Sequence, residues 1–346
     1  MKLGKAFCWR PFHELYIDRH GVKPCCHFNG HTSDDHAEVR DAIINNRWHP
    51  GCDHCQSWEQ RGWHNSHRKV YVGTKDSAAV IENKMMPKFI RIELDNICNV
   101  ACVTCDGSSS SRWIAEDRKI SGSSIHRNHA TDLRKYMIKD LWTGVDRLTV
   151  HGGEPFYSKN AKTLLEWLVA NEISKRLTIT LITNGTVIDH SMLILIKQFR
   201  SNILQFSVDG IGKIFNLVRW PSKYDKVKEN YHRTKQFLGL EPKIIYTFSL
   251  LNACSTVSAM DILTSEFTQD IILNPVVFPD HYSAKHLPDD IKQRLIESYR
   301  DDPHGQCQSL IPILESPGDP IQFEKAKLLL AKLDESRQTD HRILFC

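Results

Sequence analysis

The feature that most constrains this 346-residue chain is a regular alternation of strand-like and helix-like segments that begins near residue 88. Runs rich in branched and aromatic residues predict six strands, at 89–94, 147–151, 177–183, 203–208, 243–251 and 270–278. Helical periodicity lies between them, as at 161–173 and 191–199. Such alternation predicts parallel strands joined by right-handed crossovers. At about 31 residues per unit, six units need about 190 residues. We therefore predict an α/β fold, a partial (β/α)6 TIM-like barrel.

The predicted barrel leaves a segment on either side. Residues 1–87 hold nine of the eighteen histidines and little apolar material, and a region of that kind usually needs a metal to stay folded. Residues 281–346 contain helical patterns at 288–300 and 320–335 without another clear strand. We expect a Cys/His-rich module at 1–87, the barrel at 88–280 and a helical C-terminal extension at 281–346.

Composition excludes several classes of protein. No run of 18 apolar residues is present, so we expect no membrane span, and a net charge of +4 is too small and too scattered to indicate nucleic-acid binding. The first residues lack the apolar core of a secretory signal, so we expect a cytoplasmic location, where eleven cysteines would stay reduced. Cys254, Cys307 and Cys346 lie apart from the rest, and we expect them to be buried as small apolar residues.

Polar motifs follow the predicted strands at the points where each strand ends. The first strand is followed by three cysteines, and the next three by GGEP (152–155), TNGT (183–186) and SVDG (207–210). Asn252 follows the fifth strand and Asn274 lies in the sixth. Because the carboxyl ends of barrel strands meet at one mouth, we expect these groups to form one site.

The three cysteines after the first strand, Cys98, Cys102 and Cys105, suit a metal centre. Three thiolates can ligate three corners of a cubane iron–sulfur cluster, which leaves the fourth iron open to a substrate or cofactor. A structural zinc ion is the alternative, with His126 or His129 as the fourth ligand. The spacing of the cysteines does not separate the two.

The combination of CxxxCxxC, GGEP, TNG and SVDG resembles the radical S-adenosylmethionine (SAM) enzymes over roughly residues 88–280. The resemblance implies a [4Fe–4S] cluster on Cys98, Cys102 and Cys105 whose open iron chelates the amino and carboxylate groups of SAM. It also implies a one-electron donor, such as flavodoxin or ferredoxin, that drives cleavage of SAM to a 5′-deoxyadenosyl radical. One departure is Thr104, where many members carry an aromatic residue, and this implies altered packing near the adenine.

The resemblance also implies contacts with SAM, although it identifies no catalytic residue. Gly152, Gly153, Glu154 and Pro155 match the motif that meets the SAM amino group. Ser207 matches a residue that contacts the ribose or carboxylate, and Arg219 resembles the arginine that clamps the carboxylate. Asn252 and Asn274 are further candidates for ribose and adenine contacts. For Asn184–Gly185 and Asp209–Gly210, ordinary turn chemistry is the alternative.

A second group of cysteines lies in residues 1–87. Cys8, Gly21 and Cys26 have the spacing C-x12-G-x4-C, and Cys52-x2-Cys55 follows. This resembles the auxiliary-cluster modules called SPASM or twitch domains, here placed before the barrel. The resemblance implies a second [4Fe–4S] cluster on Cys8, Cys26, Cys52 and Cys55, with Cys25 as the alternative to Cys26. Zinc is the competing interpretation, with His27 or His54 as a substitute ligand.

Together these resemblances imply a radical SAM oxidoreductase that abstracts hydrogen from a C–H bond, in a peptide or protein as a maturase does. One alternative is a dehydrogenase of a sugar, cyclitol or other small molecule. An alternative of another class is a zinc-binding interaction protein on a degenerate barrel.

Overall fold

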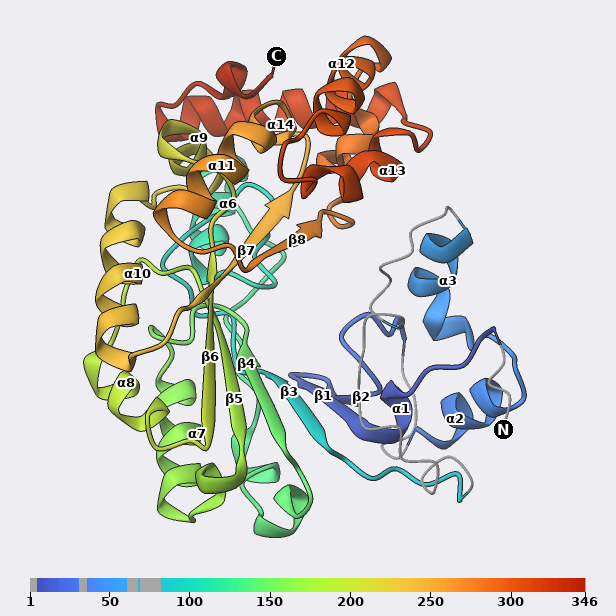
Figure 1. The fold of residues 1–346 in the computed structure, drawn as a ribbon, viewed down its shortest axis with the longest axis vertical. Coiled ribbons are helices and arrows are strands. Elements are labelled where there is room, and N and C mark those ends of the chain that lie inside the picture. Colours follow the sequence, from blue (N-terminus) through green and yellow to red (C-terminus); the bar gives the residue numbers. More distant parts are fainter. Residues whose placement is uncertain (1–4, 31–35, 61–67, 69–81, 346) are drawn as a thin grey trace.

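The computed structural model describes residues 5–30, 36–60, 68 and 82–345. Its centre is one open sheet of eight strands in the order β2-β1-β3-β4-β5-β6-β7-β8 (Figure 1). The strands are β1 (Glu14–Asp18), β2 (Gly21–Lys23), β3 (Phe89–Glu93), β4 (Arg147–His151), β5 (Thr178–Thr183), β6 (Ser201–Ser207), β7 (Lys243–Phe248) and β8 (Ile271–Pro275). Strands β3 to β8 are the six predicted ones. They are parallel and adjacent in chain order, which confirms the partial barrel.

The helices follow the strands as the alternation predicts. The α-helices are α1 (Arg10–His13), α2 (Ala37–Ile44), α3 (Asp53–Gln60), α6 (Ser111–Ser121), α7 (Lys159–Ala170), α8 (His190–Ile196), α9 (Gly212–Val218), α10 (Tyr224–Leu238), α11 (Thr256–Glu266), α12 (Asp289–Arg300), α13 (Ile311–Leu314) and α14 (Pro320–Arg337). Single 3₁₀ turns are η1 (Pro50–Cys52), η2 (Leu133–Lys135), η3 (Lys139–Trp142), η4 (Ile173–Arg176), η5 (Ala253–Ser255), η6 (Asp280–Tyr282), η7 (Ala284–His286), η8 (Cys307–Leu310) and η9 (His341–Leu344).

The two faces of the sheet differ because the side chains of a strand alternate. In β5, Ile179 and Leu181 are fully buried, and the register sets them beside Leu148 of β4 and Leu204 of β6. Helices α7, α8 and α10 lie along one side of the sheet (Figure 1). Thr180 and the other residues of alternate parity are half-buried on the opposite face. That second face, called the open face below, is not covered by these helices.

The N-terminal segment contributes two strands that the sequence did not predict. Strand β1 pairs in parallel with β3, with Tyr16 opposite Arg91, and β2 pairs antiparallel with β1. The sheet therefore has eight strands instead of six. The two additional strands are five and three residues long, too short for their alternation to stand out. Beside them, a small core gathers Phe7, Phe12, Phe28, Val39 and Ile43.

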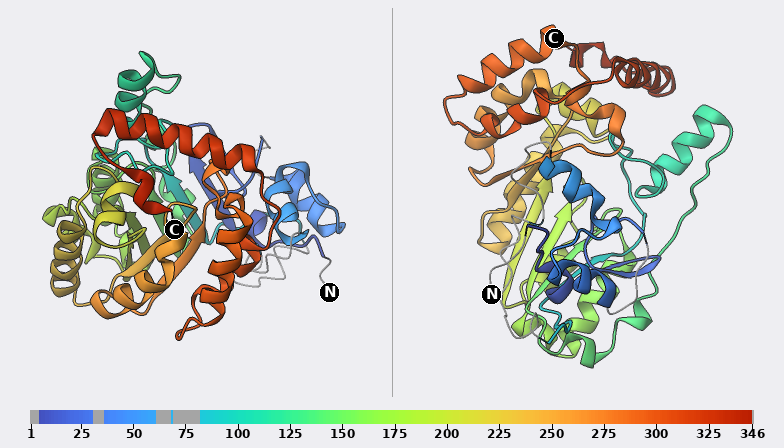
Figure 2. Two further views of the ribbon diagram at one scale, coloured as in Figure 1. Left: turned by 90° about the horizontal axis from the view of Figure 1, so that it is seen from above. Right: turned by 90° about the vertical axis from the view of Figure 1, so that its right-hand side faces the viewer.

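The C-terminal segment is helical, as predicted, and it packs onto the barrel. Helix α14 crosses above the strand ends in the view from above (Figure 2), and its Leu330 and Leu333 belong to the main core. No described helix combines the length and apolar character that crossing a membrane requires. Cys307 is buried and free as expected, but Cys254 is disulfide-bonded, so the expectation of a reduced residue there was wrong. Cys346 lies outside the described residues.

Candidate functional site

Three free thiols gather in the loop that follows β3. Cys98 and Cys102 are buried, Cys105 is half-buried, and the three pack as one cluster with Val100. Burial and then the neighbouring Cys102 raise the pKa of Cys98 to about 12. Neutral thiols are therefore the stable form without a metal, whereas a bound metal would favour thiolates. We call residues 98–105 the triad loop.

Helix α6 begins directly behind the triad loop and holds it through side chains of its first turn. Ser111 Oγ accepts from the amide of Cys98 and donates to its carbonyl, both at 3.1 Å. Ser110 Oγ donates to Val100 O at 2.6 Å, and the indole of Trp113 donates to Cys102 O at 2.7 Å. The segment from Ser110 to Trp113 thus fixes the backbone of the triad loop.

The GGEP turn after β4 packs directly against the residue that precedes the triad. The amide of Glu154 donates to Ile97 O at 2.9 Å. Gly152 and Gly153 have φ values of +93° and +52°. A Cβ atom on Gly153 would lie 2.3 Å from Ile97 O, and one on Gly152 would lie 2.5 Å from Glu93 Cγ. Gly153 is therefore required by the close approach of the Ile97 backbone and Gly152 by that of the Glu93 side chain, and both also have a positive φ.

The carboxyl group of Glu154 is fully buried and held by three donors. Its oxygens accept from Phe156 N at 3.0 Å, Thr183 Oγ1 at 2.7 Å and Asn184 N at 2.6 Å. Burial raises its pKa to about 7, and the three hydrogen bonds oppose that rise. The side chain thus links the turn after β4 to the end of β5 and lies close to its ionisation point at neutral pH.

Asn184, which the sequence left as a possible turn residue, lies beside the triad. Its Nδ2 is 3.8 Å from Cys98 Sγ and 3.0 Å from Asn99 Oδ1. Asn99 in turn donates to Thr186 Oγ1 at 2.8 Å. The TNG motif at the end of a predicted strand was the signal that pointed to this position.

Two of the remaining candidates, Arg219 and Asn252, are buried. Arg219 is buried after α9, with Nη1 2.5 Å from Asp209 Oδ2, and its charge acts on Cys98 and Cys102. Asn252 is buried after β7, where Nδ2 donates to Thr247 O at 2.9 Å and Oδ1 accepts from Ser249 N at 2.9 Å. The amide of Asn252 is therefore engaged by its own loop.

The other two candidates stand on the open face. Ser207 ends β6 opposite Ile245 and is half-buried, and Asn274 lies in β8 opposite Thr247 and is exposed. The registers of β6, β7 and β8 put both side chains on the same side of the sheet. The structure thus brings the triad, GGEP, Asn184 and Arg219 together. Ser207 and Asn274 lie apart from this group, on the open face of the sheet.

A second group of cysteines lines a pocket in the N-terminal segment. Cys8, Cys25, Cys52 and Cys55 line one small, largely apolar pocket with Phe28 and Val39. Gly51 makes the approach possible, since a Cβ there would lie 2.4 Å from the Phe28 ring. Cysteine thiolates are the protein ligands of iron–sulfur clusters, so the residue types present suit such a group.

Cys26, the residue chosen from the spacing, points elsewhere. Its Sγ accepts from Arg91 Nη1 at 3.5 Å, on the side of the barrel, and it is not among the residues that line the pocket. The alternative, Cys25, occupies that place. Over the part of the chain that the structure describes, no group of three or more His, Cys, Asp or Glu side chains is arranged around a single metal ion.

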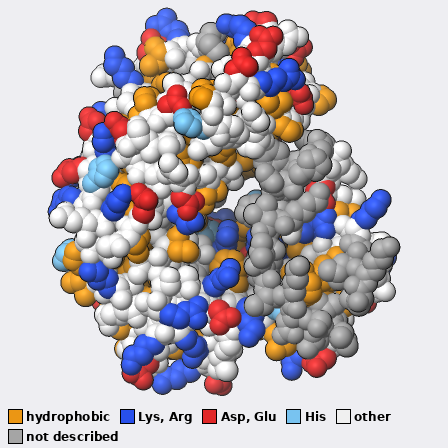
Figure 3. Space-filling view, in the orientation of Figure 1, with side chains coloured by type: hydrophobic (Ala, Val, Ile, Leu, Met, Phe, Trp, Pro, Cys, Tyr) orange, Lys and Arg blue, Asp and Glu red, His pale blue; other side chains and the backbone are white. Residues whose placement is uncertain are grey.

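A polar cluster lies on the open face where β1, β3 and β4 adjoin. Tyr16 of β1 donates to Glu93 Oε2 at 2.8 Å, and its ring lies 5.7 Å from that of His151. Arg91, on the same side of β3, reaches Cys26. Figure 3 shows a hollow in the centre of this side of the molecule, with Lys and Arg side chains on its walls. Described residues of the N-terminal segment and of the barrel thus meet on this face.

Comparison with known proteins bears on the barrel. Residues 92–241 match the family model of the radical SAM superfamily. No curated protein matches the sequence. One similar solved structure is anSMEcpe with bound AdoMet (TM-score 0.47, 17% identity, 62% of this chain and 57% of that one). The chain therefore spans less than two thirds of the length of this relative.

Two further structures have a similar fold. SuiB from Streptococcus suis, bound to the precursor peptide SuiA, has a TM-score of 0.45 and 12% identity over 83% of this chain and 67% of that one. The methyltransferase TsrM from Kitasatospora setae has a TM-score of 0.41 and 12% identity over 63% and 39%. Likenesses at this level carry no conclusion about the function of this chain. The family match begins in the strand before the triad and covers the GGEP turn and Arg219, so the part of the chain that matches the radical SAM superfamily is the barrel that carries the candidate site.

Proposed function

We propose that this chain is a radical SAM enzyme that binds a [4Fe–4S] cluster on Cys98, Cys102 and Cys105 and abstracts hydrogen from a substrate C–H bond. The observation that carries the proposal is the gathering of three free thiols beside the GGEP turn, with no fourth cysteine in the loop. Three thiolates leave one iron without a protein ligand. When bound, the cluster supplies the electron that cleaves SAM to a 5′-deoxyadenosyl radical.

The residues of the chain would bind and orient SAM at this open iron. Glu154, buried beside the triad, is suited to an ammonium group. Arg219 is held by Asp209 and offers a guanidinium for a carboxylate, and its Nε is buried with no hydrogen-bond partner among the described residues. Ser207 and Asn274 line the open face, where the ribose and adenine would extend. Asn252 would act mainly by shaping its loop, because its amide is already engaged.

For the N-terminal module we propose an auxiliary [4Fe–4S] cluster on Cys8, Cys25, Cys52 and Cys55. The pocket that these four line supports Cys25 over Cys26. The proposed parts of the chain are this module at 1–87, the barrel at 88–280 and the helical extension at 281–346. A flavodoxin or ferredoxin is the proposed reductant.

The proposed substrate is a peptide or protein that occupies the hollow between the open face and the N-terminal module. The open face is polar where the two parts meet, with Tyr16, Arg91 and His151. An extended segment of chain could lie along such a face and hydrogen bond to these side chains. A sugar or other small-molecule dehydrogenase is the second candidate, since the same polar groups suit hydroxyl groups.

The test is reductive cleavage of SAM by anaerobically reconstituted protein with a chemical reductant. We expect the wild type to form 5′-deoxyadenosine and the triple variant Cys98→Ala, Cys102→Ala, Cys105→Ala to form none. Cys307→Ala, which removes a buried free cysteine elsewhere, is the matched control and should keep activity. Cleavage at the wild-type rate in the triple variant would refute the assignment.

A further inference from the structure

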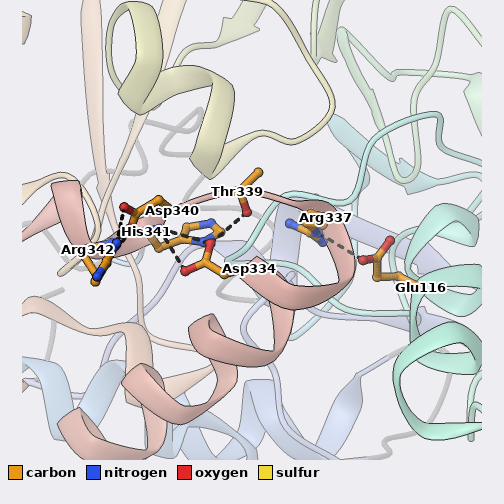
Figure 4. A network of polar contacts seen from close by, with 7 residues as sticks. All are labelled: Glu116, Asp334, Arg337, Thr339, Asp340, His341 and Arg342. Atoms are coloured by element: carbon orange, nitrogen blue, oxygen red, sulfur yellow. Dashed lines mark hydrogen bonds and ion pairs between the residues drawn. The ribbon is translucent and has the colours of Figure 1, made fainter.

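The last residue of helix α14, Arg337, lies more than 200 positions after the triad and yet is buried behind the triad loop. Its side chain is 0% exposed and its Nε lies 3.2 Å from Glu116 Oε1 (Figure 4). Glu116 belongs to α6, the helix whose first turn holds the loop. The C-terminal extension therefore reaches the same support that carries the cysteines.

Arg337 also touches the triad loop directly. Its Nη2 donates to Ala101 O at 3.1 Å, a carbonyl between Cys98 and Cys102. Its guanidinium carbon lies 4.9 Å from the ring centroid of Trp113 and 4.6 Å from that of Trp220. Both tryptophans hold the loop themselves, since the Trp113 indole donates to Cys102 O at 2.7 Å and Trp220 O accepts from Ala101 N at 2.8 Å.

The end of α14 is locked in this position by a turn. The chain reverses after Arg337, and the amide of His341 donates to both carboxylate oxygens of Asp334 at 3.1 and 3.0 Å. Thr339 Oγ1 donates to the same carboxylate at 2.8 Å (Figure 4). Ser336 Oγ donates to Glu116 Oε1 at 3.0 Å. These contacts fix the end of α14, and with it the position of the buried Arg337 guanidinium.

The electrostatic consequence follows from the position of this charge. A guanidinium stays protonated, and at low dielectric its charge acts strongly on groups within a few ångströms. The charge of Arg337 acts on Cys102. Reduction of an iron–sulfur cluster adds a negative charge, and the protein environment around the thiolates sets the reduction potential. A buried cation behind the loop therefore favours the reduced state.

We propose that Arg337 is a positioning residue of the cluster site, which orders the triad loop through Ala101 and raises the reduction potential of the cluster bound there. The C-terminal extension is then part of the site and not an appended tail. This inference rests on the proposed function for the part that concerns the cluster, whereas the contact with the loop exists in the metal-free protein.

The experiment compares three variants. Arg337→Met removes the charge and the donors but keeps an apolar stem between the tryptophans, and Arg337→Lys keeps the charge but not the planar fork. Arg342→Met is the matched control, because Arg342 belongs to the same C-terminal turn but its side chain is 88% exposed and pairs only with Asp340 in the described structure. Each protein is measured by amide hydrogen exchange of residues 98–105 without metal, by release of iron to a chelator and by redox titration of the cluster.

We expect faster exchange of the triad-loop amides in both Arg337 variants. We also expect iron release to accelerate at least about tenfold in Arg337→Met, as the loss of a charge-assisted hydrogen bond implies. The reduction potential should become more negative in Arg337→Met and shift less in Arg337→Lys. The Arg342 control should match the wild type in all three.

Identical exchange, iron release and potential in Arg337→Met and Arg342→Met would overturn the proposal. If Arg337→Met does not fold, Arg337→Lys decides through exchange and iron release, because the fork is lost in both. If the wild type held no iron, the proposed function would fail, but exchange of the loop would still test the contact.

Discussion

At the scale of single residues, Glu154 has the most distinctive chemistry of the candidate site. Burial raises its pKa from 4.5 to about 7. Between pH 4.5 and 7 the folded protein therefore keeps a proton on Glu154 that the unfolded chain has already released. The contribution of this proton to the stability of the folded state is fully present below pH 4.5 and is lost as pH rises through 7.

For metal-free protein we predict that the contribution of Glu154 to the free energy of unfolding falls by on the order of 3 kcal/mol between pH 4.5 and 7. Glu154→Gln should remove that part of the pH dependence. Denaturant titrations at several pH values measure it, with Glu166→Gln, an exposed glutamate on α7, as the control. The same pH slope in Glu154→Gln and the wild type would contradict the prediction.

Adjacent cysteines give a second test at this scale. The structure turns Cys25 into the four-cysteine pocket and Cys26 toward Arg91. We predict that Cys25→Ala loses about four irons per chain, the content of one cubane, while Cys26→Ala keeps them. Iron analysis of the reconstituted variants measures this. Loss of these irons in Cys26→Ala but not in Cys25→Ala would show that Cys26 is the ligand.

At the scale of elements, the sequence predicted the barrel strands and the motifs at their ends. It did not predict the neighbouring strands β1 and β2 or the contact of Arg337 with the triad loop. Alternation and branched residues located β3 to β8, and the motifs at their ends meet as parallel topology requires. The short strands β1 and β2 carried no such signal, because their burial depends on pairing with β3. Sequence spacing could not choose between Cys25 and Cys26. Nor could it indicate Arg337, whose role depends on a contact across more than 200 residues.

The turn between β4 and α7 gives a prediction for an element. Gly153→Ala places a Cβ against Ile97 O in a left-handed backbone, and we expect a loss of about 1–3 kcal/mol in the free energy of unfolding, with less iron bound at the triad. Gly212→Ala is a matched control, because its φ of +50° is similar to the +52° of Gly153 but nothing lies within 4 Å of the added carbon.

Thermal or denaturant unfolding and iron analysis of the two variants separate strain from collision. Both should lose stability through positive φ, and only Gly153→Ala should also lose iron. Equal iron content in the two variants would mean that the close approach of the GGEP turn does not position the triad loop.

At the scale of the whole molecule, one sheet carries both cysteine centres. Strand β1 of the N-terminal segment pairs with β3, whose end leads into the triad loop, and the polar cluster of Tyr16, Glu93 and His151 lies across that junction. From the other side, α14 closes over the triad through Arg337. Both flanking segments therefore contact the barrel close to the proposed site.

We propose that this chain holds two cubane clusters, one of them with an open iron. The decisive measurement is iron and acid-labile sulfide per chain in anaerobically reconstituted wild-type protein. We expect about eight of each. About four of each would remove the auxiliary cluster, and a protein that binds zinc without iron or sulfide would refute both proposed clusters.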